Sequence, residues 1–367
     1  MIIAARRTPI GTRGRALAEL DVGELSAPVI RAALADAEAV SGAAMDVADV
    51  LLGNCMGPGG NPARVAALAA GLGAHVPAAT IDRQCGSGLA AVLDAVAAIR
   101  AGDGRPRVAG GVESTSTAPV RSLGGVPYDR APFAPEGFPD PDMTRAAEDL
   151  ATHDGITRHR QDEHAARSHA RARTALSGGR FDAELVSLSE LRSDDAIGGA
   201  EPLLHRFRPL FPAGSLTAGN STRIGDGAAA LIVAPAGTGP GLAVRAAAIL
   251  GCDPALPGIG AAPATIAALR SAGITTEEVT AFEIVEAFAA QSLAVLDRLG
   301  IAEEDPRVCA DGGALALGHP WGASGAVALV RLFSRLVRSG APPGTVGVAA
   351  ASVGGGMGIA AVVEVVR

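Results

Sequence analysis

Cys85 is the residue whose type and surroundings point most directly to chemistry. It lies in residues 82–89 (Asp-Arg-Gln-Cys-Gly-Ser-Gly-Leu), between an apolar extended stretch and an alanine-rich segment, 89–99, with helical spacing. A cysteine at a helix start meets unpaired amides and the positive end of the helix dipole, which favour the nucleophilic thiolate. We expect Gly86 and Gly88 to let the backbone turn sharply there. The alternative is a small buried cysteine in a tight turn, which an isolated cysteine would favour.

Two distant segments favour the chemical interpretation. Residues 312–325 (Gly-Gly-Ala-Leu-Ala-Leu-Gly-His-Pro-Trp-Gly-Ala-Ser-Gly) hold His319 in a glycine-bounded loop, where its imidazole can act as the base that a thiol needs. Residues 352–358 (Ser-Val-Gly-Gly-Gly-Met-Gly) offer backbone amides without side chains, which suits a developing oxyanion. A tight turn between two strands is the other interpretation of this glycine run, and both can hold together.

Length and composition restrict the class of protein. A chain of 367 residues exceeds one ordinary core, so we expect two or more domains or one duplicated domain. A single Trp, a single Tyr and a net charge of −7 argue against a nucleic-acid partner. The four cysteines form no CxxC pair and no disulfide-type spacing, which indicates a reducing compartment. With no signal-peptide pattern and no apolar run of membrane length, the sequence predicts a cytoplasmic protein without a membrane partner.

The elements that must position Cys85 and His319 alternate between strand and helix, which predicts a layered α/β architecture. We expect helices at 22–37, 62–71 and 89–99, and strands at 47–52, 76–81 and 107–111. The second half resembles the first. Residues 86–88 (Gly-Ser-Gly) have a counterpart in 323–325 (Ala-Ser-Gly), and each precedes an apolar helix and then a strand, 107–111 or 345–350. The order and spacing predict two related halves that face each other.

Residues 115–203 differ in composition from the two halves, which predicts an insertion in the core. They carry clustered prolines and charges, followed by two polar helices expected at 144–153 and 157–176. The histidines of this region never fall four residues apart, so a solvated helix face is favoured over a metal site, and we expect no metal; they are His153, His159, His164 and His169. The domains expected are 1–114 with 204–238, the insertion 115–203, and 239–367.

Together with residues 7–11 (Arg-Thr-Pro-Ile-Gly), 110–114 (Gly-Gly-Val-Glu-Ser) and 285–291 (Val-Glu-Ala-Phe-Ala-Ala-Gln), these motifs resemble the thiolase family over essentially the whole chain. The resemblance implies a five-layered α-β-α-β-α core of two similar halves with an inserted loop domain, assembled as a homodimer or homotetramer. It also implies acyl transfer between coenzyme A thioesters, with a carbon–carbon bond made or broken beside a carbonyl. A coenzyme A thioester is then the substrate, and no cofactor is permanently bound.

The resemblance assigns roles residue by residue. Cys85 is the nucleophile, His319 its activating base, and the amides of Cys85 and Gly354 form the oxyanion hole. The residues expected at the substrate are Met143, Ser221, Thr222, Arg223, Phe288 and Trp321. Arg223 stands where a glycine is usual, so it either binds a phosphate or narrows the tunnel. Trp321 replaces a smaller aliphatic residue and either shortens the acyl pocket or packs in the core.

Two departures from the family pattern fall on the carbon–carbon half of the reaction. Ser352 stands where a second cysteine usually acts as acid and base, and a serine hydroxyl does not titrate near neutrality as a thiol of pKa ~8.5 does. Val285 stands where an Asn or His usually holds a water at the enolate oxygen. Glu286 is a candidate auxiliary base, although a glutamate is also normal there.

Three functions remain open at this stage. The first is a thiolase-like acyltransferase that forms an acyl thioester on Cys85. The second uses the same intermediate but passes the acyl group to an oxygen, a nitrogen or a carrier-protein thiol in a specialised biosynthetic pathway. The third is a protein that binds acyl thioesters without turning them over, although a pure binder would not need both Cys85 and His319.

Overall fold

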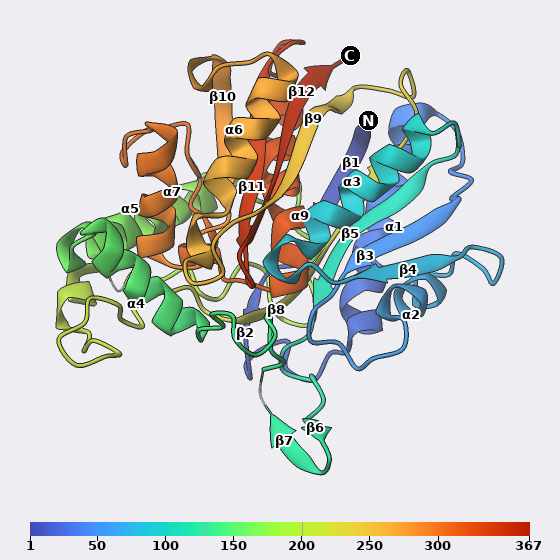
Figure 1. The fold of residues 1–367 in the computed structure, drawn as a ribbon. Coiled ribbons are helices and arrows are strands. Elements are labelled where there is room, and N and C mark those ends of the chain that lie inside the picture. The colour runs from blue at the N-terminus through green and yellow to red at the C-terminus, as the bar shows by residue number, and fades with distance from the viewer. Residues whose placement is uncertain (129, 200) are drawn as a thin grey trace.

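The computed structural model describes residues 1–128, 130–199 and 201–367, and its core is one long sheet folded around two central helices (Figure 1). The strands follow the order β10-β11-β12-β9-β1-β8-β5-β3-β4, with the short β2 paired to β8. Their bounds are β1 (Ile2–Arg7), β2 (Gly11–Thr12), β3 (Asp49–Gly53), β4 (Ala78–Ile81), β5 (Arg107–Glu113), β8 (Gly225–Val233), β9 (Gly241–Gly251), β10 (Val279–Ile284), β11 (Val346–Val353) and β12 (Met357–Val366). One pairing, Ile2 with Leu242, joins the two halves.

The predicted duplication is confirmed by the pairing pattern. In the first half β3 is parallel to β5, β5 is antiparallel to β8, and β8 is antiparallel to β1. The second half repeats this with β10 parallel to β11, β11 antiparallel to β12, and β12 antiparallel to β9. The two halves differ in one connection, which runs from β5 to β8 in the first half and from β11 to β12 in the second. The first connection carries the insertion, whereas the second is the short glycine turn at 354–356.

The five predicted layers are confirmed as well. The inner layer is α3 (Ser87–Arg100) and α9 (Trp321–Leu332, continued as a π-helix over Phe333–Arg338), and its side chains share one apolar cluster with the inner faces of both half-sheets. α1 (Val22–Ser41) and α2 (Pro62–Ala69) cover the outer face of the first half. α6 (Ala261–Ala272) and α7 (Ala289–Leu299) cover that of the second. Residues 322–332 of α9 are all buried, as expected for a helix with protein on every side.

The close approach of α3 and α9 depends on glycines. A Cβ atom built on Gly88 would lie 2.8 Å from the Gly322 carbonyl oxygen, and one on Gly111 of β5 would lie 2.1 Å from the same oxygen. Our expectation that Gly86 and Gly88 make the sharp turn was wrong. The residue with positive φ is Gln84 (φ 45°), whereas Gly86 has φ −89°. Glycine is needed at position 86 for room, because a side chain there would collide with Val353 and Ile359.

The insertion leaves the core after β5 and returns at β8. It contains the hairpin β6 (Arg121–Leu123) and β7 (Val126–Tyr128), then α4 (Met143–Asp154) and α5 (Arg158–Ser177), which confirm the two predicted helices. Its later part is anchored by buried charges. Arg7 of β1 donates to Glu184 (2.7 Å) and Asp194 (2.6 Å), and Arg331 of α9 also pairs with Glu184. The domain boundaries at 115, 204 and 239 stay predictions.

The packing of α3 on α9 yields a stability prediction. Gly88→Ala should lower the urea midpoint by the equivalent of about 1–3 kcal/mol, because the new methyl group meets a backbone carbonyl and Ala326, neither of which can rotate away. The matched control is Gly104→Ala, whose Cβ has no neighbour within 4 Å and which should stay within about 0.5 kcal/mol. Equal midpoints for the two variants would contradict this account of the inner layer.

Candidate active site

Cys85 sits in a strained turn at the start of α3. The 3-10 turn Gln84–Gly86 leads directly into the helix, and Gln84 takes the left-handed backbone conformation that β-carbon-bearing residues rarely adopt. Ser87 stabilises this turn, since its Oγ donates to the Gln84 carbonyl (2.6 Å) and accepts from the Arg83 amide (2.7 Å). The turn therefore fixes the direction in which the Cys85 thiol points.

His319 is held by its backbone on the opposite side of the site. Its amide donates to the Arg223 carbonyl (2.9 Å), and its carbonyl accepts from the Gly225 amide (3.3 Å), so the loop at 217–227 fixes it like a short strand pair. The Nε2 atom of His319 lies 3.3 Å from Cys85 Sγ. The two residues predicted from distant motifs are thus in hydrogen-bond contact.

Ser324, which sequence reasoning did not assign to the site, contacts the ring nitrogen of His319 that is not in contact with Cys85. Its Oγ lies 2.6 Å from His319 Nδ1 and donates to the Pro320 carbonyl at 3.1 Å. A hydroxyl has one proton, so a serine that donates to Pro320 accepts from Nδ1–H. Nε2 is then unprotonated and faces the thiol as a proton acceptor. The signal for Ser324 was its position in the Ala-Ser-Gly repeat, on the first turn of the helix that follows His319.

Burial makes Cys85 and His319 a neutral pair. Burial raises the pKa of the Cys85 thiol to about 12, with the nearby Glu113 and Asp82 carboxylates adding to the effect, and lowers the pKa of His319 to about 4. Loss of solvation therefore outweighs the amides at the helix start, which we expected to favour the thiolate. The proton leaves Cys85 only when His319 can take it, so the imidazole acts as a general base.

Glu113 holds the surrounding backbone in place. Its buried carboxylate accepts from the amides of Cys55 (3.0 Å), Met56 (3.0 Å) and Gly322 (2.9 Å), and from Asn54 Nδ2 (3.0 Å). The bond to Gly322 ties the end of β5 to the first turn of α9, three residues after His319. The motif at 110–114 thus serves the site through position rather than through chemistry.

Ser352 uses both capacities of its hydroxyl on the outer side of β11. Its Oγ donates to the Gly258 carbonyl (2.6 Å) and accepts from the Ala261 amide at the start of α6 (3.0 Å). Gly354, predicted for the oxyanion hole, follows Val353, which packs against Gly86 in the turn that carries Cys85. The oxyanion role of Gly354 and the acid–base role of Ser352 stay predictions.

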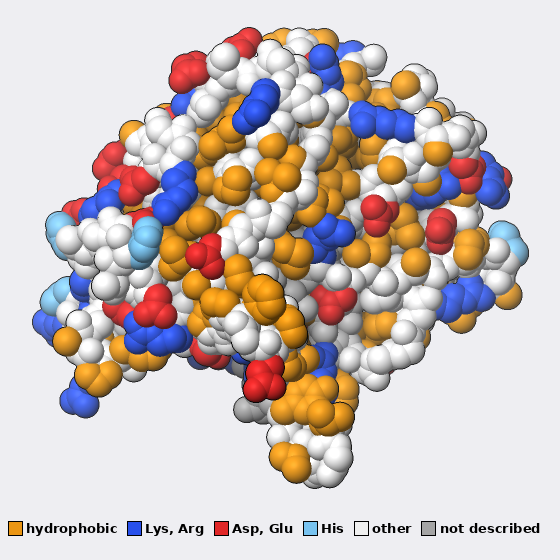
Figure 2. Space-filling view, in the orientation of Figure 1, with side chains coloured by type: hydrophobic (Ala, Val, Ile, Leu, Met, Phe, Trp, Pro, Cys, Tyr) orange, Lys and Arg blue, Asp and Glu red, His pale blue; other side chains and the backbone are white. Residues whose placement is uncertain are grey.

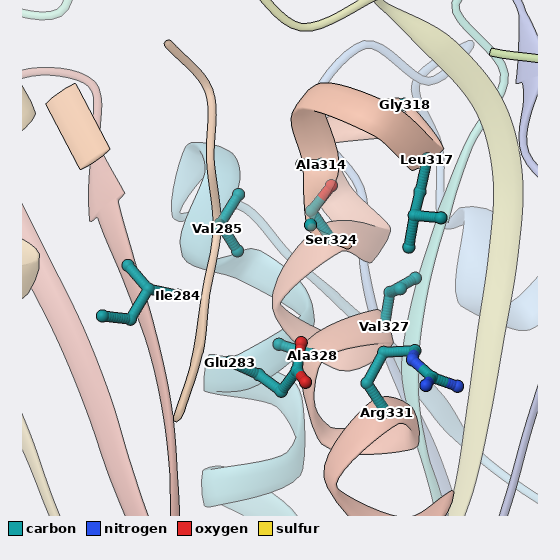
Figure 3. Close-up of a pocket in the computed structure, with 11 residues that line it drawn as sticks. Glu283, Ile284, Val285, Ala314, Leu317, Gly318, Ser324, Val327, Ala328 and Arg331 are labelled. Carbon is teal, nitrogen blue, oxygen red and sulfur yellow. The ribbon is translucent and has the colours of Figure 1, made fainter. Parts of the chain in front are cut away.

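Val285 lies in the central apolar cluster, and its side chain points toward α9 (Figure 3). It lines a cavity of about 30 Å³ together with Ser324, Val327 and Arg331. That volume suits one or two waters, but Val285 itself offers no hydrogen bond to them. The environment at this position is therefore apolar on the Val285 side and polar on the Ser324 side.

Glu286 is engaged away from Cys85. Its carboxylate accepts from Ser168 Oγ (2.7 Å) and lies 3.2 Å from His164 Nε2, both on α5. Burial raises the pKa of Glu286, but these partners outweigh it and hold that pKa below its usual value. This placement ties the insertion to the core and does not support Glu286 as an auxiliary base.

The predicted substrate residues are brought together only in part. Ser221 pairs with Phe288 through the backbone. Thr222 donates through its amide to the Ala287 carbonyl (3.0 Å) and through Oγ1 to the Ala314 carbonyl (2.6 Å). The loop at 217–227 therefore contacts both the motif at 285–291 and the motif at 312–325. Arg223 is exposed. Met143 and Trp321 are the half-buried first residues of α4 and α9. Their contacts with substrate stay predictions.

Three of the four insertion histidines each lie beside a different carboxylate. His153 lies beside Asp154 (2.7 Å), His159 beside Glu163 (3.2 Å), and His164 beside Glu286. Within residues 1–128, 130–199 and 201–367, no group of three or more His, Cys, Asp or Glu is arranged to hold a metal ion. In the same residues, no helix is both long and apolar enough to cross a membrane.

The neutral pair gives a pH prediction. The rate of Cys85 acylation should be nearly constant between about pH 5 and pH 10, because His319 is neutral above its pKa of about 4 and Cys85 is protonated below its pKa of about 12. The measurement is single-turnover acylation by a thioester across this range, with Cys85→Ser as the blank. A rate that rises with a midpoint near 6.5, the ordinary pKa of histidine, would contradict the neutral pair.

Comparison with known proteins agrees with this geometry. The family model described as "Thiolase, N-terminal domain" matches residues 1–237, and "Thiolase, C-terminal domain" matches residues 240–365. The putative acetyl-CoA C-acetyltransferase YhfS of Bacillus subtilis is 40% identical over 376 aligned positions, covering 100% of this chain and 99% of that protein. An acetyl-CoA acetyltransferase of Cupriavidus necator is 39% identical, covering 99% and 98%.

Solved structures agree in fold. The acetyl-CoA acetyltransferase of Bacillus anthracis superposes with a TM-score of 0.90 at 34% identity, and human mitochondrial 3-ketoacyl-CoA thiolase with 0.88 at 29%; each comparison covers 100% of this chain and 98% of the other. Matches to both family domains, near-complete coverage and the Cys85–His319 contact lead to one conclusion: the chain belongs to the thiolase family and is an acyltransferase.

Proposed function

We propose that this acyltransferase forms an acyl thioester on Cys85 from an acyl-coenzyme A, as an acetyl-CoA C-acyltransferase would, and that its carbon–carbon half-reaction is weak. The observation that carries the proposal is the contact of Cys85 Sγ with His319 Nε2 at 3.3 Å. Coenzyme A thioesters are the substrate class of the family, and the relatives are named for acetyl-CoA.

In the acyl half-reaction, Cys85 Sγ attacks the thioester carbonyl carbon while its proton passes to His319 Nε2. Ser324 accepts from Nδ1–H and thereby stabilises the imidazolium that forms. The carbonyl oxygen becomes an oxyanion, for which the backbone amides of Cys85 and Gly354 are the proposed donors. Collapse of this intermediate breaks the bond to the coenzyme A sulfur, which leaves with the proton from Nε2. The products are acyl-Cys85 and free coenzyme A.

The second half-reaction in a thiolase needs a base for the acceptor carbon. Ser352 is poorly suited, because a serine hydroxyl does not titrate near neutrality and its proton is already directed at the Gly258 carbonyl, while one of its two lone pairs accepts from the Ala261 amide. Val285 adds no hydrogen bond beside the small cavity at Ser324. The acyl half of the site is therefore complete, and the carbon–carbon half lacks a free acid–base group at either position.

This asymmetry favours one second candidate function. An acyl-Cys85 intermediate that is not passed to a carbon acceptor can be passed to an oxygen, a nitrogen or a carrier-protein thiol, as in a specialised biosynthetic pathway. A non-catalytic acyl-thioester binder is the remaining alternative, and the tautomer set by Ser324 counts against it, because binding alone does not require an oriented base.

We also propose a homo-oligomer, either a dimer or a tetramer, in the cytoplasm. The hairpin of β6 and β7 protrudes from the core and carries exposed apolar atoms (Figures 1 and 2), among them Leu123 (80% exposed) and Val126 (69% exposed). β4 is the last strand of the sheet, and no other strand of the described residues pairs with its outer edge. Both features support association of copies. The cysteines are unpaired, which fits a reducing compartment.

Intact-protein mass spectrometry after incubation with acetyl-CoA tests the proposal. We expect one acetyl group on the protein and none on Cys85→Ser. Acetoacetyl-CoA thiolysis should be about 10²–10⁴-fold slower than acylation, the usual worth of general acid–base catalysis. Absence of acetylated protein would contradict the proposed acyl transfer, and equally fast thiolysis would contradict the weak second half.

Restoring the two missing groups sharpens the test. Ser352→Cys combined with Val285→Asn should raise thiolysis without accelerating acylation, because the thiol supplies an acid–base group and the amide can hold a water in the cavity lined by Ser324. The matched control is Ser352→Ala with Val285→Asn, which removes the same hydroxyl without adding a thiol. An equal gain in both double variants would show that acid–base chemistry at residue 352 is not what the protein lacks.

A further inference from the structure

A phenyl ring from the insertion covers the glycine turn that follows Ser352. A Cβ atom built on Gly354 would lie 2.8, 3.2 and 3.3 Å from the Cε2, Cδ2 and Cζ atoms of Phe133, and one on Gly355 would lie 3.2 Å from Phe133 Cβ. The edge of the ring therefore rests on the backbone of Gly354, and an ordinary side chain there would collide with it. No motif in the sequence pointed to Phe133.

The ring is held from two further directions. The Arg130 guanidinium lies over its face, 4.7 Å from the centroid, at a distance typical of a cation–π contact. Asp140 ties the same loop together, since it accepts from Arg130 Nη1 (2.7 Å) and from the Phe133 amide (3.2 Å). The Arg130 partner holds the pKa of Asp140 below its usual value, so this carboxylate stays charged. Phe133 is thus a fixed wall of the loop rather than a freely rotating side chain.

The position of this wall matters because of where the acyl group must lie. Gly86, next to Cys85, packs against Val353, so the nucleophile and the glycine turn are neighbours. An acyl carbonyl bonded to Cys85 Sγ, with its oxygen about 3 Å from the Gly354 amide, begins its chain within a few ångströms of the backbone that Phe133 covers. An acyl chain that extends past the Gly354 side of the turn would meet the ring edge, whereas an acetyl group would be too short to reach it.

We propose that Phe133 is a specificity-determining residue that restricts acylation of Cys85 to short acyl groups. This inference rests on the proposed acyl transfer and on Gly354 as an oxyanion donor, and it assigns the size limit to a residue of the insertion. The step itself is unchanged: the thiol replaces coenzyme A on the acyl carbon, and coenzyme A leaves with the proton.

The test measures the rate constants for single-turnover acylation of the whole chain by acetyl-CoA and by hexanoyl-CoA. Intact-protein mass spectrometry is the readout. Phe133→Ala should raise the ratio of the hexanoyl to the acetyl rate constant by about 10-fold or more, since hydrophobic pockets discriminate by roughly that factor per methylene. Phe133→Trp should lower the same ratio. Phe138→Ala is the matched control: it removes a phenyl ring from the same loop, but that ring is 64% exposed and should leave the ratio unchanged.

The outcomes separate the two proposals. A parent protein that acetyl-CoA does not acylate would overturn the proposed function, and the role of Phe133 with it. Acylation of the parent with a ratio that neither Phe133 variant shifts would overturn the role of Phe133 alone. If Phe133→Ala does not fold, the ratio in Phe133→Trp decides the matter, because its direction of change is opposite to that expected from a merely loosened loop.

Discussion

The close packing of α3 on α9 is the constraint on which the rest of the site depends. Cys85 and His319 belong to different halves of the chain, and each lies just before the first turn of one of these helices. Only glycines at the crossing let the two backbones approach closely enough to put Sγ 3.3 Å from Nε2. The outer layers, the strand pairing and the carboxylate of Glu113 all serve to hold this crossing in place.

Burial of that crossing also determines the chemistry. A helix start favours a thiolate, but removing the thiol and the imidazole from water disfavours any charge, and the second effect is the larger here. The pair is therefore neutral and works by moving one proton as the thioester is attacked. The second half of the site has no comparable pair, since the Ser352 hydroxyl bonds to the start of α6 and the turn before it, and Val285 offers no hydrogen bond to the cavity that it lines.

The sequence predicted the duplication from its repeated motifs, the layers and the pairing of Cys85 with His319 from its resemblance to the family, and both insertion helices from their local pattern. It missed what depends on contacts between distant segments. The strain falls on Gln84 rather than on Gly86, because the glycines are needed for room and not for a turn. The hydrogen bonds of Ser352 come from the start of α6 and the turn before it. The position of Phe133 follows from an ion pair within the proline-rich stretch 127–141 of the insertion, which has no periodicity to interpret. The tautomer role of Ser324 could have been inferred from its place beside His319, but only once the helix direction was known.

The protonation state of His319 is the most direct test of this account. Nitrogen NMR of the protein labelled with ¹⁵N-histidine, compared with His319→Gln to assign the signals, reports the proton on each ring nitrogen. We expect a neutral imidazole at pH 7 with its proton on Nδ1, and a shift toward the other tautomer in Ser324→Ala. A charged imidazolium in the resting protein, or a proton on Nε2, would contradict the neutral proton relay between Cys85 and His319.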